Sequence, residues 1–163
     1  MLTAAAAGAA PARARAVAAA NALTPQLVSA VVVDDVASNR ELFGRLLARR
    51  GVASVFYASD GAEALQLLES TEARGVQCVF LDKEMPVMDG HECVARLRAT
   101  PGLAHIPIVG VTGNALEEDR LAFVAAGADV VVVKPVHIAA IERALASLGL
   151  HLAPARAAAE AAR

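Results

Sequence analysis

The chain has 163 residues, a formal net charge of −2 and an apolar fraction of 56%, to which alanine at both ends contributes. This length fits one domain with flanking tails, and a domain of about 120 residues can bury a hydrophobic core without disulfide bonds. The near-neutral charge gives no reason to expect nucleic-acid binding, and no long apolar run outside the alanine stretches indicates a membrane span. Two cysteines, Cys78 and Cys93, are too few for a disulfide framework. We therefore expect both to be free thiols that pack as small apolar side chains, in a protein of a reducing compartment.

The two ends of the chain differ in composition from its middle. Residues 1–27 are rich in alanine, carry Arg13 and Arg15, and contain no acidic residue. A flexible leader or linker is the expected interpretation, although basic leaders without acids also occur as organelle-targeting peptides. Residues 150–163 are alanine-rich as well. We therefore predict one cytoplasmic domain over residues 28–149, between a flexible leader and a tail.

Short runs of β-branched residues alternate with amphipathic segments along the middle of the chain. The runs are mostly apolar on both faces, as in strands of a parallel sheet that is covered on both sides. We expect strands at residues 28–33, 53–58, 76–81, 106–111 and 129–133.

The segments between these runs carry helix signals. Two apolar faces at helical spacing are expected to be buried: Leu42, Phe43, Leu46 and Leu47, and later Ile138, Ile141, Leu145 and Leu148. Three pairs fit a cap residue followed by Glu: Asp60 with Glu63, Asp89 with Glu92, and Asn114 with Glu117. Helix ends are expected near Gly51, Gly75 and Gly127. Five strands alternating with five helices predict a doubly wound α/β domain with strand order 2-1-3-4-5.

Polar residues stand at the ends of four of the predicted strands. Asp34 and Asp35 follow the first strand, Asp82 the third, Thr112 the fourth and Lys134 the fifth. Because all strands of a parallel sheet end at one edge, these side chains are expected to converge in one pocket. The order 2-1-3-4-5 makes the first and third strands neighbours at that point.

Three close carboxylates repel one another, and a hard divalent cation such as Mg²⁺ relieves the repulsion. An ammonium and a hydroxyl beside the carboxylates suit a phosphoryl group, whose transfer needs mainly positioning and charge neutralisation. A free carboxylate can attack phosphorus to form an aspartyl phosphate. The set therefore predicts phosphoryl transfer to an aspartate.

Four stretches make the chain resemble response-regulator receiver domains: VVVDDVASNRELF, VFLDKEMPVMDG, IPIVGVTGNA and GADVVVVKP. They cover about residues 29–148. The resemblance implies a flavodoxin-like receiver fold and transfer of a phosphoryl group from a histidine kinase or histidine phosphotransfer protein, with no nucleic acid and no membrane as partner. The first and third stretches look most like receivers attached to hybrid histidine kinases.

The resemblance also assigns roles. Asp82 would be phosphorylated, and Asp35, Asp82 and the backbone carbonyl of Glu84 would ligate Mg²⁺, with Asp34 acting largely through water. Thr112 would shift toward the phosphoryl group and Lys134 would pair with it. Pro135 would follow a cis peptide bond.

The chain departs from the family pattern at one signalling position. Three residues before the lysine, where many members carry Tyr or Phe, it has Val131. The usual coupling of the threonine shift to rotation of an aromatic ring is therefore absent. Glu84 and Asn114 stand where family members tune dephosphorylation.

Two other classes of protein could carry a similar set of residues. Phosphohydrolases that form an aspartyl phosphate share the sheet and the metal site, but their nucleophile is expected on an earlier strand, often within a DKTGT-like signature. A pseudo-receiver that has lost phosphorylation would be an interaction module only. The presence of all five strand-end residues favours the active receiver, which would catalyse only its own phosphorylation and dephosphorylation.

Overall fold

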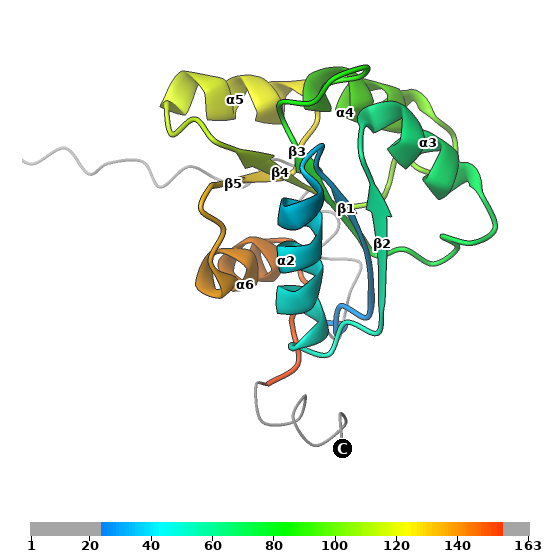
Figure 1. Ribbon diagram of the computed structural model, residues 1–163, viewed down its shortest axis with the longest axis vertical. Helices are drawn as coiled ribbons and strands as arrows, with labels where there is room; N and C mark the ends of the chain where they lie inside the picture. The colour runs from blue at the N-terminus through cyan, green and yellow to red at the C-terminus, as the bar shows by residue number, and fades with distance from the viewer. Residues whose placement is uncertain (1–23, 155–163) are drawn as a thin grey trace, which may run out of the picture.

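The five predicted strands lie side by side in one parallel sheet, in the expected order β2-β1-β3-β4-β5 (Figure 1). The structure is a computed structural model and describes residues 24–154. The strands are β1 (Ser29–Val33), β2 (Ser54–Ala58), β3 (Cys78–Asp82), β4 (Ile108–Thr112) and β5 (Val130–Val133). Helices α2 (Ala37–Ala48), α3 (Gly61–Glu69), α4 (Gly90–Ala99), α5 (Glu117–Ala126) and α6 (Ile138–Ser147) alternate with them. The predicted doubly wound α/β fold is confirmed.

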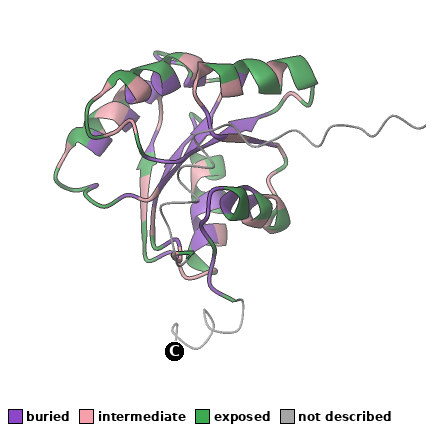
Figure 2. Ribbon diagram, turned by 180° about the vertical axis from the view of Figure 1, so that it is seen from behind, coloured by how far each residue is buried: buried purple, intermediate pink, exposed green. Residues whose placement is uncertain are grey.

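Alternate residues of each strand face opposite sides of the sheet, and helices cover both sides. Ala30 and Val32 of β1 belong to a hydrophobic core with residues of α2 and α6, whereas Val31 and Val33 belong to a second core with residues of α3, α4 and α5. Figure 1 shows the same division of the helices, and Figure 2 shows the buried residues concentrated in the sheet between them. Polar side chains can therefore reach solvent most readily where the strands end.

The expectation that every strand is buried on both faces is wrong for β2. This strand lies at the edge of the sheet, and its Ser54 and Tyr57 are exposed. The central strands β3 and β4 are buried at every position. The predicted strand order places β2 at the edge, where it has a neighbour on one side only, but its apolar composition does not reveal which of its residues are exposed.

Strands β3 and β4 begin two residues later and end one residue later than the predicted ranges 76–81 and 106–111. Val76 and Ile106 are buried, but their N–H groups donate to carbonyls of the preceding turns instead of to a neighbouring strand. Burial therefore starts before the sheet hydrogen bonds do. The two strands end on Asp82 and Thr112 themselves, which fixes both side chains at the sheet edge.

One predicted helix face is only partly buried. In α2, Phe43 and Leu47 lie in the core, but Leu42 is 61% exposed and Leu46 is half-buried. The predicted apolar face of α2 is wider than the part of the helix that packs on the sheet. Only side chains that point toward the sheet are buried. In α6 the corresponding prediction holds better, with Ile141, Leu145 and Leu148 buried and Ile138 half-buried.

The predicted helix starts are correct for α3 and α4 and wrong for α5. Asp60 and Asp89 cap their helices by accepting backbone N–H groups of the first turn. Helix α5 instead begins after Leu116, and the Asn114 side chain accepts the Leu116 N–H in the preceding loop. Asn114 therefore shapes the loop after β4 and does not cap the helix.

The predicted helix ends vary in the same way. Gly127 is the residue that ends α5, with φ of 121°, in the region that favours glycine. Helix α3 ends at Glu69, well before Gly75, so the prediction for that helix end is wrong. Ser70 follows α3 in an extended conformation, and its hydroxyl donates to the Leu67 carbonyl.

Core packing extends past the predicted bounds of 28–149 on both sides. Leu27 is fully buried, and Leu150 and Leu152 are nearly so. Gln26 and His151 form an isolated parallel bridge, and the Leu27 N–H donates to the His151 carbonyl at 2.7 Å. The remainder of the predicted leader and tail, residues 1–23 and 155–163, lies outside the described residues. Within residues 24–154, no helix has both the length and the apolar character needed to cross a membrane.

A buried ion pair ties α4 to the strands beside it. The Arg98 guanidinium donates to Asp129 at 2.7 Å, and the same carboxylate oxygen accepts the Ile108 N–H at 2.8 Å. Arg98 also donates to the carbonyls of Gly127 and Ile106. Only 3% of the Asp129 side chain is exposed, so this charge depends on its partner.

Arg98→Ala should lower the free energy of unfolding by about 3 kcal/mol, because it leaves the buried Asp129 carboxylate without its cation. The measurement is urea denaturation of the wild-type and variant proteins. Arg96→Ala is the matched control on the same helix, since its pair with Glu92 is exposed and worth at most about 1 kcal/mol. Equal losses in the two variants would contradict the structural importance of the buried pair.

Candidate functional site

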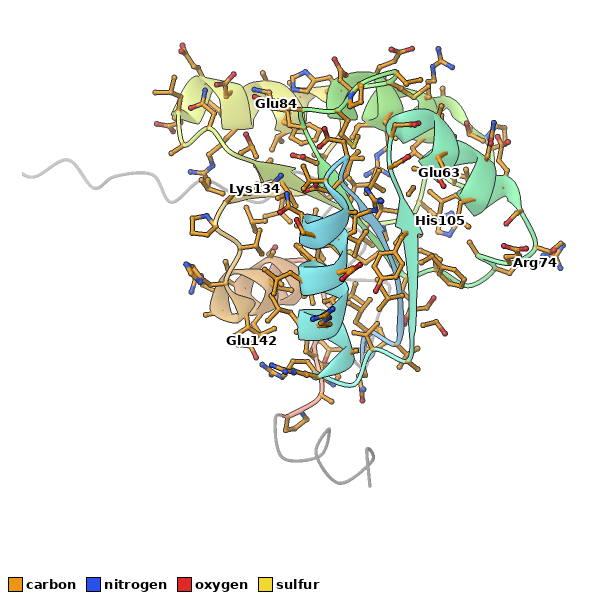
Figure 3. The ribbon with its side chains drawn as sticks, in the orientation of Figure 1. Glu63, Arg74, Glu84, His105, Lys134 and Glu142 are labelled. Carbon is orange, nitrogen blue, oxygen red and sulfur yellow. The ribbon has the colours of Figure 1, made fainter. Side chains whose placement is uncertain are left out.

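The edge where the strands end gathers the polar residues that the sequence singled out. Asp34 directly follows β1, Asp82 ends β3, Thr112 ends β4 and Lys134 directly follows β5. Strands β1, β3, β4 and β5 are consecutive neighbours in the sheet, so these four positions form one row. Figure 3 shows Lys134 and Glu84 toward the end of the domain where α2 begins.

Lys134 bridges two buried carboxylates. Its Nζ atom donates to Asp34 Oδ2 and to Asp82 Oδ2, both at 2.8 Å. Asp34 and Asp82 are 6% and 4% exposed, whereas the Lys134 side chain is 30% exposed. The ammonium thus supplies the positive charge for two buried carboxylates that would otherwise lie near each other without a cation.

The electrostatic environment shifts the pKa values of this pair. Burial raises the pKa of the Asp82 carboxyl above its ordinary value, and the hydrogen bond and charge of Lys134 oppose this rise. Burial disfavours the charged form of Lys134, but its hydrogen bonds to Asp34 and Asp82 outweigh that effect, so the pKa of Lys134 is raised. The lysine is therefore held in its charged form at neutral pH.

A third carboxylate joins these two. Oxygen atoms of Asp34, Asp35 and Asp82 lie within 4.8 Å of one another. Asp35 is exposed, and no described residue forms a hydrogen bond with its side chain. Mg²⁺ prefers oxygen ligands and retains several waters, so a cluster of three carboxylates with one open to solvent fits this ion.

Asp34 is held by more residues than the sequence predicted. Its Oδ1 accepts the Val36 N–H at 2.9 Å, and the Asn39 amide donates to Oδ1 and Oδ2 at 3.1 and 3.2 Å. Arg40 donates to the Asp34 backbone carbonyl at 2.6 Å. The roles of Asn39 and Arg40 were not foreseen, although both lie in the quoted stretch VVVDDVASNRELF, where their spacing from Asp34 places them in the first turn of the following helix.

The loop that follows Thr112 is linked to the loop that follows Asp82. Thr112 is 1% exposed, and its hydroxyl oxygen accepts the Asn114 N–H at 3.1 Å, which leaves its own hydrogen free to donate elsewhere. The Asn114 amide donates to Asp119 of α5, and Lys83 pairs with the same carboxylate at 2.9 Å. Lys83 and Asp119 were also missed, because a pairing across 36 residues leaves no local sequence signal.

Glu84, the remaining predicted site residue, makes fewer contacts with the carboxylate cluster. Glu84 is exposed in the loop after β3, and a backbone hydrogen bond from it favours the charged form of Asp82. In the same loop Val87 has φ of 68°, an uncommon value for a β-branched residue, and the Met88 N–H donates to the Pro86 carbonyl. After this tight turn the chain returns to the end of β3, where the Gly90 N–H donates to the Lys83 carbonyl at 2.9 Å.

The loop after β5 has the form that the resemblance implied. The peptide bond between Lys134 and Pro135 is cis. Val131, at the position where an aromatic residue is common in the family, is 8% exposed and packs in the core beneath α3, α4 and α5. A valine there fills core volume and has no ring that could turn between two positions.

Comparison with known proteins agrees with this geometry. A family model for the response regulator receiver domain matches residues 30–146. The chain is 32% identical over 120 residues to hybrid signal transduction histidine kinase I of Dictyostelium discoideum, and 37% identical over 116 residues to sensor histidine kinase RcsC of Salmonella typhi. Each alignment covers 71% of this chain but only 7% and 12%, respectively, of the two kinases.

Solved structures show the same fold. Chemotaxis protein CheY4 of Vibrio cholerae superposes with a TM-score of 0.67 at 30% identity, over 75% of this chain and 98% of that protein. The receiver domain of sensor histidine kinase PA1611 from Pseudomonas aeruginosa gives 0.63 at 27% identity, over 77% of this chain and 98% of that domain. That structure holds a magnesium ion in its active-site cleft.

The fold and the family model define a receiver domain, and the chain belongs to the response regulator receiver family of two-component systems. It spans a small part of the two kinases to which it is similar.

Lys134→Met should lower the free energy of unfolding by about 2 kcal/mol at about pH 7, because two buried carboxylates lose their shared cation. Without Lys134 the folded-state pKa of Asp82 rises further above its unfolded value. The destabilisation therefore appears as pH rises through that folded pKa and fades toward about pH 4, where the Asp82 carboxyl of the variant is protonated. Urea denaturation at both pH values measures it.

The double variant Asp82→Asn/Lys134→Met serves as the control for this loss. It removes one of the two carboxylates together with the cation, so its unfolding free energy at about pH 7 should lie closer to the wild-type value. A double variant that is less stable than Lys134→Met alone would show that charge repulsion is not the cause.

Proposed function

We propose that this chain accepts a phosphoryl group from a phosphohistidine onto Asp82 in a Mg²⁺-dependent two-component phosphorelay. The observation that carries the proposal is the Lys134 ammonium, 2.8 Å from both Asp34 and Asp82, beside a cluster of three carboxylates. A receiving carboxylate, a movable cation and a free hydroxyl donor together match the charge that a transferred phosphoryl group brings.

The chemical step follows from these groups. A carboxylate oxygen of Asp82 attacks phosphorus, the new P–O bond forms as the P–N bond to the donor histidine breaks, and the imidazole nitrogen keeps the electron pair and takes a proton. Lys134 can then leave the Asp82 carboxylate and pair with a phosphoryl oxygen. Thr112 can donate to another, because its hydroxyl hydrogen is not used by the Asn114 contact.

The residues fit a role for Mg²⁺. Asp35, Asp82 and the backbone carbonyl of Glu84 would hold the ion directly, and Asp34 largely through water. When bound, the ion neutralises negative charge on the carboxylates and on the incoming phosphoryl group. The exposure of Asp35 supports this arrangement, since it leaves one carboxylate open to an ion from solvent.

The donor is proposed to be a histidine kinase or a histidine phosphotransfer protein that approaches over α2. A groove of about 420 Å³ runs from Asp34 and Lys134 along apolar residues that include Leu42, Phe43 and Pro135. Because Lys134, which lines this groove, also bonds to Asp82, a helix carrying the phosphohistidine could rest there and reach Asp82. The exposure of Leu42 supports such a contact surface.

The wider assignment follows from the relatives. We propose a cytoplasmic signalling module, part of a hybrid histidine kinase or free, whose only catalysis is its own phosphorylation and dephosphorylation. Added charge at the sheet edge would bias the loop after Thr112 and helix α5, through Asn114 and Asp119. With Val131 in the core, this route replaces a rotating aromatic ring.

Acetyl phosphate with Mg²⁺ should add one phosphoryl group to the wild-type protein, and Asp82→Asn should show no such addition, because the amide is not a nucleophile for phosphorus. Intact-protein mass spectrometry measures the product, with and without a metal chelator. Removal of Mg²⁺ should abolish labelling of the wild-type protein as well.

Asp89→Asn is the matched control, since it also removes one acid, from the loop between β3 and α4, where Asp89 caps the helix. It should be labelled as the wild type is. Full labelling of Asp82→Asn would refute the assignment of the phosphoacceptor. Repeated turnover of a phosphomonoester by the wild type would favour a phosphohydrolase instead.

A further inference from the structure

The carboxylate of Asp34 is the most heavily hydrogen-bonded group of the site. Each of its oxygens accepts two donors: Oδ1 from the Val36 N–H and the Asn39 amide, Oδ2 from the same amide and from Lys134. Asp35 and Asp82 have fewer contacts with described residues. Asp34 therefore has a fixed orientation before any ion or phosphoryl group arrives.

Among these donors, only Asn39 contacts both oxygens. A single amide that bridges the two oxygens, at 3.1 and 3.2 Å, sets the plane of the carboxylate, which one contact to one oxygen does not. Arg40, the next residue, fixes the backbone carbonyl of Asp34 at 2.6 Å. The first turn of α2 thus holds both the side chain and the main chain of this residue.

The contact with Lys134 is of a different kind. Lys134 shares its ammonium between Asp34 and Asp82, so any group that draws the ammonium away from Asp82 also disturbs its bond to Asp34. Asn39 does not contact Asp82, and its bonds to Asp34 do not depend on the position of the lysine. It can keep the carboxylate aligned while the lysine moves.

We infer that Asn39 is a positioning residue for the divalent cation, acting through Asp34. The inference rests on the proposed function, because it concerns the Mg²⁺ that the phosphoryl transfer uses. Mutation of a residue that hydrogen-bonds to a metal-binding carboxylate commonly lowers the metal affinity by about tenfold to a hundredfold. Asn39 contributes at the lower end, since Asp34 keeps two further donors without it.

The test is calorimetric titration of Mg²⁺ into the unphosphorylated wild-type and Asn39→Ala proteins. The dissociation constant should rise about tenfold in the variant. Asn39→Gln, which keeps the amide on a longer side chain, should recover part of the affinity. Ser38→Ala is the matched control, because Ser38 is an exposed neutral residue of the same helix turn. The Mg²⁺ affinity of this variant should equal that of the wild-type protein.

A second readout separates positioning from a structural role. At saturating Mg²⁺ the acetyl phosphate labelling rate of Asn39→Ala should approach the wild-type rate, while the Mg²⁺ concentration at half-maximal rate increases. A rate that stays low at every Mg²⁺ concentration, with a lowered urea midpoint, would indicate structural damage and overturn the inference.

Two outcomes of the titration distinguish this inference from the proposal beneath it. Equal Mg²⁺ affinity in wild type and Asn39→Ala would overturn the role of Asn39 and leave the phosphoacceptor assignment standing. Absence of Mg²⁺ binding by the wild-type protein would overturn the proposed metal dependence, and the inference with it.

Discussion

Two buried carboxylates, from strands adjacent in the sheet, share the ammonium of Lys134 at 2.8 Å on each side, and the site depends on this bridge. A parallel sheet forces its strand ends together, so acids placed there would repel one another without a cation. The lysine supplies that cation from β5, two strands away from β3. It also stands where it can exchange one partner for another, because its side chain is only partly buried.

Hydrogen bonds from two neighbouring segments, the first turn of α2 and the loops after β3 and β4, hold the residues around this bridge. On one side the first turn of α2 fixes Asp34 through Asn39 and Arg40. On the other side, Lys83 and Asn114 both bond to Asp119, which connects the loops that follow β3 and β4. Such rigid supports suit the proposed phosphoryl acceptance, since charges that are already oriented need no further ordering when a further negative charge arrives.

Helix starts that carry their own capping residue, at Asp60 and Asp89, could be predicted from local pattern, because the bond that makes them joins near neighbours. The exposure of Ser54 and Tyr57 on β2, the exposure of Leu42 and the loop role of Asn114 could not. Each of these depends on which other element lies opposite. Likewise, the row of strand-end residues was predictable from the alternation of strands and helices. The contacts of Asn39 and Arg40 with Asp34 were not, although both residues lie in one of the matching stretches.

The sequence by itself determined the doubly wound fold and the residues at the strand ends, since hydrophobic periodicity fixes where strands stop and parallel pairing fixes that they stop together. Only the tertiary structure decided that Lys134 bridges Asp34 and Asp82, and that Asn39 spans both oxygens of Asp34. The reason is physical, because hydrogen bonds act over about 3 Å. Lys134 reaches Asp34, a hundred positions away, only after the chain has folded, and Asn39 reaches both oxygens only once the turn before α2 has its final shape.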